Sequence, residues 1–219
     1  MAYIIAIDEG TTSTRAVLYD LGKKRITAQK ASPVKQIYPE QGYVEENAGE
    51  IYAETLASLV EMIEQADRPE NILGIGVTNQ RETVIAWDKT TGKPLYNAIV
   101  WQCRRTAETI AEIGEKHGGT IREKTGLVLD AYFSASKMKW LMDNVPAIRE
   151  KAAAGELCFG TVDSFLCYKL TGGKAFVTDV TNASRTMLFN IHTCEWDDEL
   201  LNIFGIPKSS LPKVIMSDE

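Results

Sequence analysis

The chain opens with an apolar segment, a polar turn and a second apolar segment. Residues 3–7 and 16–19 are typical of buried strands, and residues 8–15 between them read Asp-Glu-Gly-Thr-Thr-Ser-Thr-Arg. Gly10 permits a tight turn and a close approach to a ligand. Hydroxyls and the N–H groups of such a turn donate to phosphate oxygens. The pattern therefore predicts a phosphate-binding loop between two strands.

Two charged residues of this turn have chemistry of their own. Asp8, at the end of a buried strand, can hold Mg²⁺ directly or through water, and Arg15 adds a charge-assisted donor. An ordinary hairpin turn has the same composition and remains the alternative. Neither of the two common glycine-rich phosphate motifs is present, so a strand-turn-strand loop points to the actin-like, ribonuclease H-like architecture.

Composition excludes several classes of protein. The 219 residues are 44% hydrophobic and 25% charged, as in ordinary globular domains, and the net charge of −6 argues against a nucleic-acid partner. No apolar stretch is long enough to cross a bilayer and no secretory signal is visible, so we expect a cytoplasmic protein with no membrane association. The four cysteines and two histidines do not have zinc-ligand spacing.

Periodicity predicts an α/β fold, a mixed sheet with flanking helices. A helix should begin after Asn47, another after Thr161, and glycines 118 and 119 should end a third. Two short strands near residues 178 and 188 are expected to pair. The predicted strands cover residues 3–8, 14–20, 25–31, 71–78, 84–87 and 157–159. The helix that the two glycines should end covers 103–117, and the remaining helices cover 120–126, 134–144 and 197–204.

A second polar group follows a buried strand. Arg81 and Glu82 stand where α/β proteins commonly place ligand contacts. A polyol needs donors and acceptors together, which Arg and Glu supply, while Tyr132 can add a hydroxyl and Trp101 can cover a C–H face. The alternatives are a surface ion pair between Arg81 and Glu82 and two plain core aromatics. Asp163 can simply complement a helix dipole.

Four strings carry a family resemblance. Residues 8–13, 79–83, 99–106 and 181–191 closely resemble the glycerol kinases of the FGGY carbohydrate kinase family, which is related to actin and Hsp70. The likeness spans nearly the whole chain. It implies a ribonuclease H-like domain, one of two that flank a cleft. It also implies that ATP, with Mg²⁺, phosphorylates a terminal hydroxyl of glycerol to give sn-glycerol 3-phosphate.

The resemblance also assigns roles in the phosphate loop. Thr11, Thr12 and Ser13 would contact nucleotide phosphates, Arg15 would lie near the same phosphates, and Asp8 would organise the metal.

In the second group, the resemblance implies that Arg81, Glu82 and Tyr132 bind the glycerol hydroxyls and that Trp101 packs on its carbon skeleton. Glu9 departs from the family, which has glutamine there. A second carboxylate beside phosphate is unfavourable unless its side chain turns away or meets the metal. Asp179 and Arg185 are set aside as loop residues that could brace one another.

The family is about twice as long as this chain. The resemblance therefore implies that residues 1–219 are an N-terminal domain, that the C-terminal domain is absent, and that the main catalytic base lies beyond Glu219. On its own the chain should phosphorylate glycerol poorly or not at all, and the intact enzyme should form homodimers or homotetramers. The alternatives are a catalytically silent binding fragment and a kinase for another polyol or sugar.

Overall fold

The computed structural model describes residues 2–218 and divides them into two compact units. Unit 1 runs to Gln36 and resumes over Glu46–Gln80, and unit 2 comprises Ile37–Glu45 and the chain from Arg81 onward. The chain passes from one unit to the other at the short strands β4 (Gln36–Ile37) and β5 (Glu45–Glu46). The prediction that residues 1–219 form one N-terminal domain stays a prediction.

Unit 1 is built on a four-stranded mixed sheet with the order β3-β2-β1-β6. Strands β1 (Tyr3–Glu9), β2 (Ser13–Asp20) and β3 (Arg25–Pro33) run antiparallel, and β6 (Ile72–Asn79) is parallel to β1. The three N-terminal strands and the strand near residue 75 were predicted from the sequence, and their positions are confirmed. Parallel addition of β6 requires a crossover, which the helix α1 and the short 3-10 turn η1 (Pro69–Asn71) provide.

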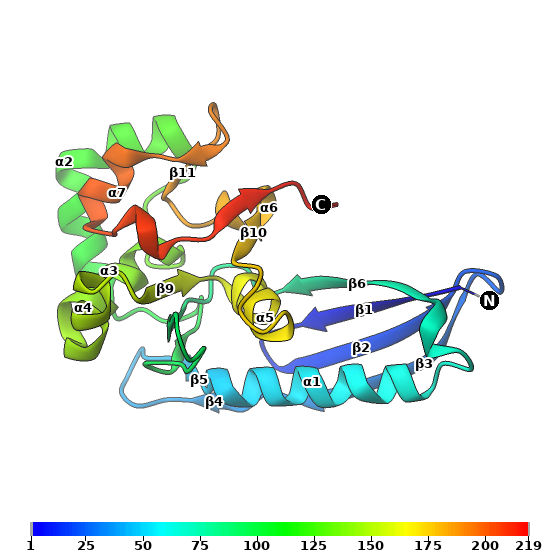
Figure 1. Ribbon diagram of the computed structural model, residues 1–219. Coiled ribbons are helices and arrows are strands. Elements are labelled where there is room, and N and C mark those ends of the chain that lie inside the picture. Colours follow the sequence, from blue (N-terminus) through cyan, green and yellow to red (C-terminus); the bar gives the residue numbers. More distant parts are fainter. Residues whose placement is uncertain (1, 219) are drawn as a thin grey trace. The chain divides into compact units, whose positions relative to one another are not determined.

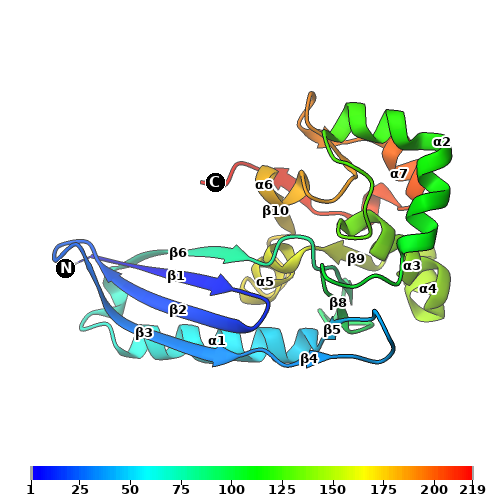
Figure 2. The same cartoon turned by 180° about the vertical axis from the view of Figure 1, so that it is seen from behind.

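Helix α1 (Ala48–Glu64) lies along one face of this sheet in both views of the ribbon (Figures 1 and 2). It begins where predicted, because the Asn47 side chain accepts hydrogen bonds from the N–H groups of Gly49 and Glu50. Its apolar side, with Ile51, Leu59 and Met62, is buried against β1, β2 and β3. Burial of that stripe, and not helix propensity, supplies most of the stability of such a helix.

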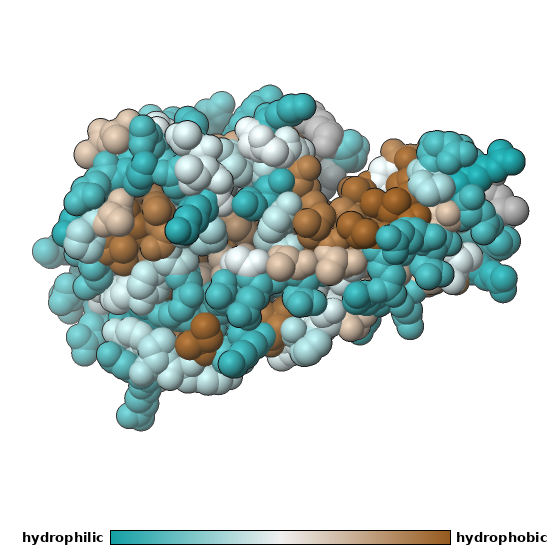
Figure 3. Space-filling view, turned by 60° about the horizontal axis from the view of Figure 1, so that its bottom comes forward, coloured by the Kyte–Doolittle hydropathy of each residue, from teal (hydrophilic) through white to brown (hydrophobic). Residues whose placement is uncertain are grey.

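The outer strand β6 is only partly covered. Ile75 is paired with Ile5, so the two side chains lie on the same face of the sheet, but α1 packs mainly against the other three strands. Leu73 and Ile75 are therefore 69% and 45% exposed. Figure 3, in which the bottom of Figure 1 comes forward, shows hydrophobic side chains gathered over this part of the molecule.

Unit 2 has short strands and most of the helices. Its core includes Leu141, Phe159, Leu188 and Phe204, which are all fully buried or nearly so. Its elements are β7 (Ile85–Asp88), β8 (Ala98–Ile99), α2 (Ala107–Thr125), α3 (Ser134–Asn144), α4 (Pro146–Ala153), β9 (Leu157–Gly160), α5 (Val162–Leu170), β10 (Val177–Asp179), α6 (Val180–Ala183), β11 (Phe189–Asn190), β12 (Glu195–Trp196), α7 (Asp198–Phe204), η2 (Lys208–Ser210) and β13 (Lys213–Ile215).

The prediction that glycines 118 and 119 end a helix is wrong. Both lie inside the single helix α2, which continues to Thr125 and ends at Gly126 with φ of 70°. Each internal glycine costs roughly 1 kcal/mol relative to alanine. Ile110 and Ile121, on either side of the glycines, are both buried in the core, and this burial outweighs the cost.

The prediction that the strands near residues 178 and 188 pair with each other is also wrong. β10 pairs in parallel with β13, and β11 forms a hairpin with β12. Both true partners lie further along the chain, where their two- and three-residue strands carry too little periodicity to be recognised.

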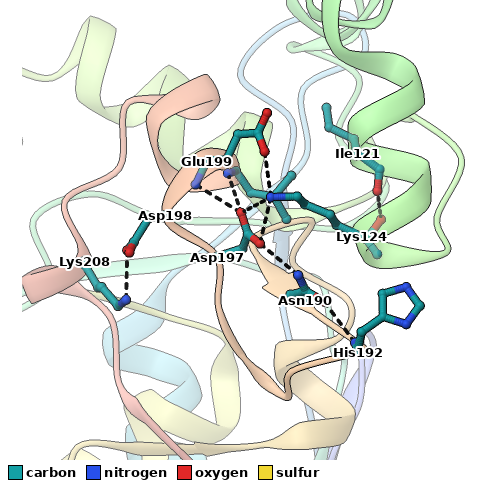
Figure 4. Close-up of polar contacts among 10 residues, drawn as sticks. Ile121, Lys124, Asn190, His192, Asp197, Asp198, Glu199 and Lys208 are labelled. Atoms are coloured by element: carbon teal, nitrogen blue, oxygen red, sulfur yellow. Dashed lines mark hydrogen bonds and ion pairs between the residues drawn. The ribbon is translucent and has the colours of Figure 1, made fainter.

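Helix α7 is held to α2 by a polar network (Figure 4). The Asp197 carboxylate caps α7 by accepting from the N–H groups of Glu199 and Leu200, and it also accepts from Lys124 of α2 at 2.9 Å and from Asn190 at 2.9 Å. Burial opposes ionisation of this carboxyl group, but the hydrogen bonds from Lys124 and Asn190 outweigh it and lower its pKa to about 2.

We expect Asn47→Ala to destabilise unit 1 by about 1 kcal/mol, because it removes the acceptor for two N–H groups at the start of α1. Urea unfolding followed by circular dichroism measures the change. Asn47→Asp keeps the acceptor and serves as the matched control, which should retain the stability. An equal loss in both variants would contradict the capping role.

Candidate functional site

The turn between β1 and β2 is tight. The Gly10 N–H donates to the Ser13 carbonyl at 3.0 Å, and the Val34 N–H donates to the Thr12 carbonyl at 3.0 Å. A Cβ atom at position 10 would lie 3.2 Å from the Ser13 oxygen, so a larger residue would press on the turn. Thr11 and Ser13 are half-buried and Thr12 is exposed, which leaves this turn open to a ligand.

Asp8 and Arg15 are brought together by the register of the sheet. They are direct partners across the antiparallel pair of β1 and β2, and both side chains are exposed. Partners in an antiparallel pair point to the same face. The carboxylate and the guanidinium therefore lie on one face of the sheet beside the turn.

Glu9 turns the other way, into the interior. Its side chain is fully buried and accepts hydrogen bonds from the Thr14 hydroxyl and the Gln80 amide, both at 3.3 Å. The same Gln80 nitrogen donates to buried Glu46 at 2.7 Å. Burial, with the nearby Glu46 carboxyl, raises the pKa of Glu9 to about 8, and burial raises that of Glu46 to about 7. Glu9 is therefore mostly uncharged at neutral pH, and it faces away from the exposed Asp8 side chain.

In unit 2 the structure brings two of the predicted aromatic residues together. The Trp101 and Tyr132 rings lie 5.3 Å apart between centroids at an interplanar angle of 58°. Both side chains are half-buried, so each keeps a surface that a ligand can contact. The backbone N–H of Trp101 donates to the Thr83 hydroxyl at 3.2 Å, which connects this aromatic pair to the segment that carries Glu82.

Glu82 is buried and paired with a residue that the sequence analysis set aside. The Arg185 Nε donates to Glu82 Oε1 at 2.7 Å, and the Ser134 hydroxyl donates to the Glu82 backbone carbonyl at 3.2 Å. The Arg185 guanidinium also lies 4.9 Å from the Phe133 ring and 5.9 Å from the Tyr132 ring. Arg185 thus joins the cluster formed by Glu82, Trp101 and Tyr132.

The suggested brace between Asp179 and Arg185 is replaced by other contacts. Asp179 accepts from the Thr181 hydroxyl and from the Asn182 N–H at 2.8 Å, as the N-cap of α6. The suggested surface ion pair also fails, because Glu82 is buried and pairs with Arg185, while its neighbour Arg81 is exposed. The only sequence signal for Arg185 was its place in a string shared with the resembled family.

Asp8, the predicted metal ligand, is not part of a cluster of ligating side chains among the described residues. Among residues 2–218, no three His, Cys, Asp or Glu side chains are grouped so that they could hold a metal ion. Mg²⁺ is commonly bound by one or two carboxylates together with waters and substrate phosphates, so Asp8 fits a metal that arrives with a nucleotide.

None of the helices described here has the length and apolar content needed to span a membrane.

Comparison with known proteins defines the family. Residues 3–219 match the model of the FGGY family of carbohydrate kinases, N-terminal domain. The glycerol kinase of Bacillus thuringiensis is 55% identical over 99% of this chain, which covers 44% of that protein. Among solved structures, the Plasmodium falciparum glycerol kinase with ADP has a TM-score of 0.90 at 38% identity, over 98% of this chain and 43% of that one. Ligand-bound xylulose kinase from Lactobacillus acidophilus has a TM-score of 0.85 at 26% identity, over 98% and 42% of the two chains.

The chain therefore belongs to the FGGY family of carbohydrate kinases, and it matches the N-terminal domain of that family. The fold is the ribonuclease H-like, actin and Hsp70 type that the sequence predicted. The chain spans less than half the length of the curated relatives that it matches.

We expect Glu9→Gln to change how stability depends on pH. The folded state raises the pKa of Glu9 from its ordinary value of 4.5 to about 8, so it favours the protonated carboxyl. The stability tied to this group is complete below about pH 4.5 and is lost as pH rises toward 8, by up to about 1.4 kcal/mol per pKa unit. Glutamine cannot ionise, so the variant should match the unmutated chain near pH 5 and exceed its melting temperature near pH 8. Exposed Glu70→Gln is the control; an equal pH slope for all three proteins would contradict the prediction.

Proposed function

We propose that this chain carries the polyol site and the phosphate loop of a glycerol kinase. The reaction is transfer of the γ-phosphoryl group of ATP, in the presence of Mg²⁺, to a terminal hydroxyl of glycerol, which gives sn-glycerol 3-phosphate. The observation that carries the proposal is the buried Glu82 carboxylate, held by Arg185 beside the Trp101 and Tyr132 rings. The 55% identity to a glycerol kinase favours glycerol over the larger sugars of the family.

The proposed polyol site combines a carboxylate acceptor with side-chain donors. Glu82 has one oxygen committed to Arg185, and its second oxygen can accept from a glycerol hydroxyl. Arg81, exposed and next to Glu82 in the chain, and the Tyr132 hydroxyl supply donors. Trp101 offers a ring face to the carbon skeleton, and the rings exclude water from the bound hydroxyls.

The phosphate loop holds the nucleotide end. The hydroxyls of Thr11, Thr12 and Ser13 and the N–H groups of the turn donate to phosphate oxygens, and the Arg15 guanidinium adds positive charge. Asp8 would hold Mg²⁺, directly or through water. The metal, when bound with the nucleotide, neutralises charge on the phosphates. Since Glu9 is buried and mostly uncharged, Asp8 supplies the negative charge at the end of β1.

The acceptor hydroxyl also needs an orienting carboxylate or base. The family resemblance puts this aspartate beyond Glu219, so we propose that residues 1–219 alone turn over glycerol slowly or not at all. A cytoplasmic location, where ATP is available, and a homodimeric or homotetrameric intact enzyme belong to the same proposal. A silent binding fragment and a kinase for another polyol or sugar are the competing functions.

We expect the full-length protein that carries this chain to consume ATP with glycerol in a coupled assay, and residues 1–219 alone to show little or no turnover. Xylulose, gluconate and erythritol, tested in parallel, should be poor substrates. If the protein preferred one of these compounds, that compound and not glycerol would be its substrate. Turnover by residues 1–219 at the full-length rate would contradict the requirement for the rest of the protein.

We expect Arg81→Ala to weaken glycerol binding by roughly 10- to 100-fold in the full-length protein, because a hydrogen bond from a charged donor contributes about 1.5–3 kcal/mol. Arg122→Ala, at an exposed position on α2, is the matched control and should leave the dissociation constant for glycerol unchanged. Glycerol titration by calorimetry measures both. Unaltered affinity in Arg81→Ala would show that this arginine does not contact the polyol.

A further inference from the structure

Lys137 of α3 is a buried cation with an unusual set of partners. Its side chain is fully buried, and its Nζ donates to three successive backbone carbonyls: Ala131 at 2.7 Å, Tyr132 at 2.6 Å and Phe133 at 2.9 Å. An ammonium group has three protons, so these bonds use all of its donors. The geometry is that of a clamp that closes on one short segment of backbone.

The position of Lys137 is energetically unfavourable for a charged group. Lys137 lies in the first turn of α3, where the helix dipole disfavours a positive charge, and burial of an ammonium group costs free energy unless its hydrogen bonds are complete. Plain packing would be served better by an apolar side chain of the same length. A buried lysine at this position therefore points to a requirement for the exact path of the backbone at residues 131–133.

That path decides the position of the aromatic cluster. The Tyr132 ring lies 5.3 Å from Trp101 and 5.2 Å from Phe133, and the Arg185 guanidinium that holds Glu82 lies over Phe133. A shift of this segment would move a ring that faces the polyol site and loosen the support of the group that holds Glu82.

The segment is also fixed from its other side. The Tyr132 N–H donates to Asp130 at 2.8 Å, and the Asp130 carboxylate accepts from Arg104 at 2.5 Å. The backbone before α3 is therefore held at the Tyr132 N–H group by a carboxylate and at three carbonyls by Lys137, which leaves it little freedom.

We propose that Lys137 is a positioning residue for polyol binding, which holds residues 131–133 so that Tyr132 stays against Trp101. The inference rests on the proposed glycerol site. Lys137 does not touch the substrate; it acts through the backbone of Tyr132.

The clamp depends on the charge of Lys137. Burial lowers its pKa to about 7, against the opposing effects of Cys103, Glu82 and Asp130, while Arg104 lowers it further. The neutral amine has two N–H donors for three carbonyls, so it cannot hold all of them. Glycerol affinity should therefore be highest below the pKa of Lys137 and fall as pH rises through it.

The test uses Lys137→Met in the full-length protein, with Lys139→Met as the control. Lys139 is on the same helix and makes a surface ion pair with Asp143. We expect the KM for glycerol to rise about tenfold or more in Lys137→Met, with the KM for ATP unchanged, because a phosphate loop on another segment is unaffected. Amide hydrogen exchange of residues 131–133 should become faster in the same variant and stay unchanged in Lys139→Met.

In folded Lys137→Met, an unchanged glycerol KM, or an equal rise in the KM values for glycerol and ATP, would overturn the proposal. If the variant does not fold, the unmutated protein supplies the second measurement. Its dissociation constant for glycerol should rise between about pH 6 and about pH 9, and a flat profile would overturn the proposal. No glycerol binding by the unmutated protein at any pH would contradict the proposed function itself, whereas normal binding with an unchanged KM in the variant contradicts the role of Lys137 alone.

Discussion

The alternation of side chains along β1 is the constraint on which the proposed phosphate loop depends. Tyr3, Ile5 and Ile7 are buried, so the period of two leaves Asp8 exposed and turns Glu9 into the interior. A shift by one residue would bury the proposed metal ligand and expose the apolar face of the strand. The hydrophobic core of unit 1 therefore fixes which of two adjacent carboxyl groups can meet a ligand.

In unit 2, buried charged groups fix the positions of the side chains that form the candidate site. Lys137 is a fully buried cation whose three donors all have carbonyl partners, and the buried Glu82 carboxylate is paired with the half-buried Arg185. Such groups add little net stability compared with apolar side chains, but any loss of a partner is expensive. They therefore favour one arrangement of the backbone around Trp101 and Tyr132, which suits the proposed polyol site.

Much of the fold could be predicted because its signals are local. The cap at Asn47, the alternation of β1 and the apolar stripe of α1 all lie within a few residues of the elements they specify. The predictions that failed are those in which local residue preference competes with contacts between residues far apart in the sequence. The glycines at 118 and 119 are helix breakers locally, but the buried faces on both sides keep α2 continuous, and β10 takes a partner more than thirty residues away.

The sequence by itself determined the tight turn between β1 and β2, the strands that flank it and, through extended strings of residues, membership in the FGGY family. Only the tertiary structure decided the state and partners of its charged groups. The raised pKa of Glu9 needs the desolvation that packing creates, the pairing of Glu82 with Arg185 spans about a hundred residues of chain, and the clamp of Lys137 exists only once α3 has formed. Desolvation and distant pairing are properties of the folded chain, because they depend on which residues meet in space and not on which are neighbours in sequence.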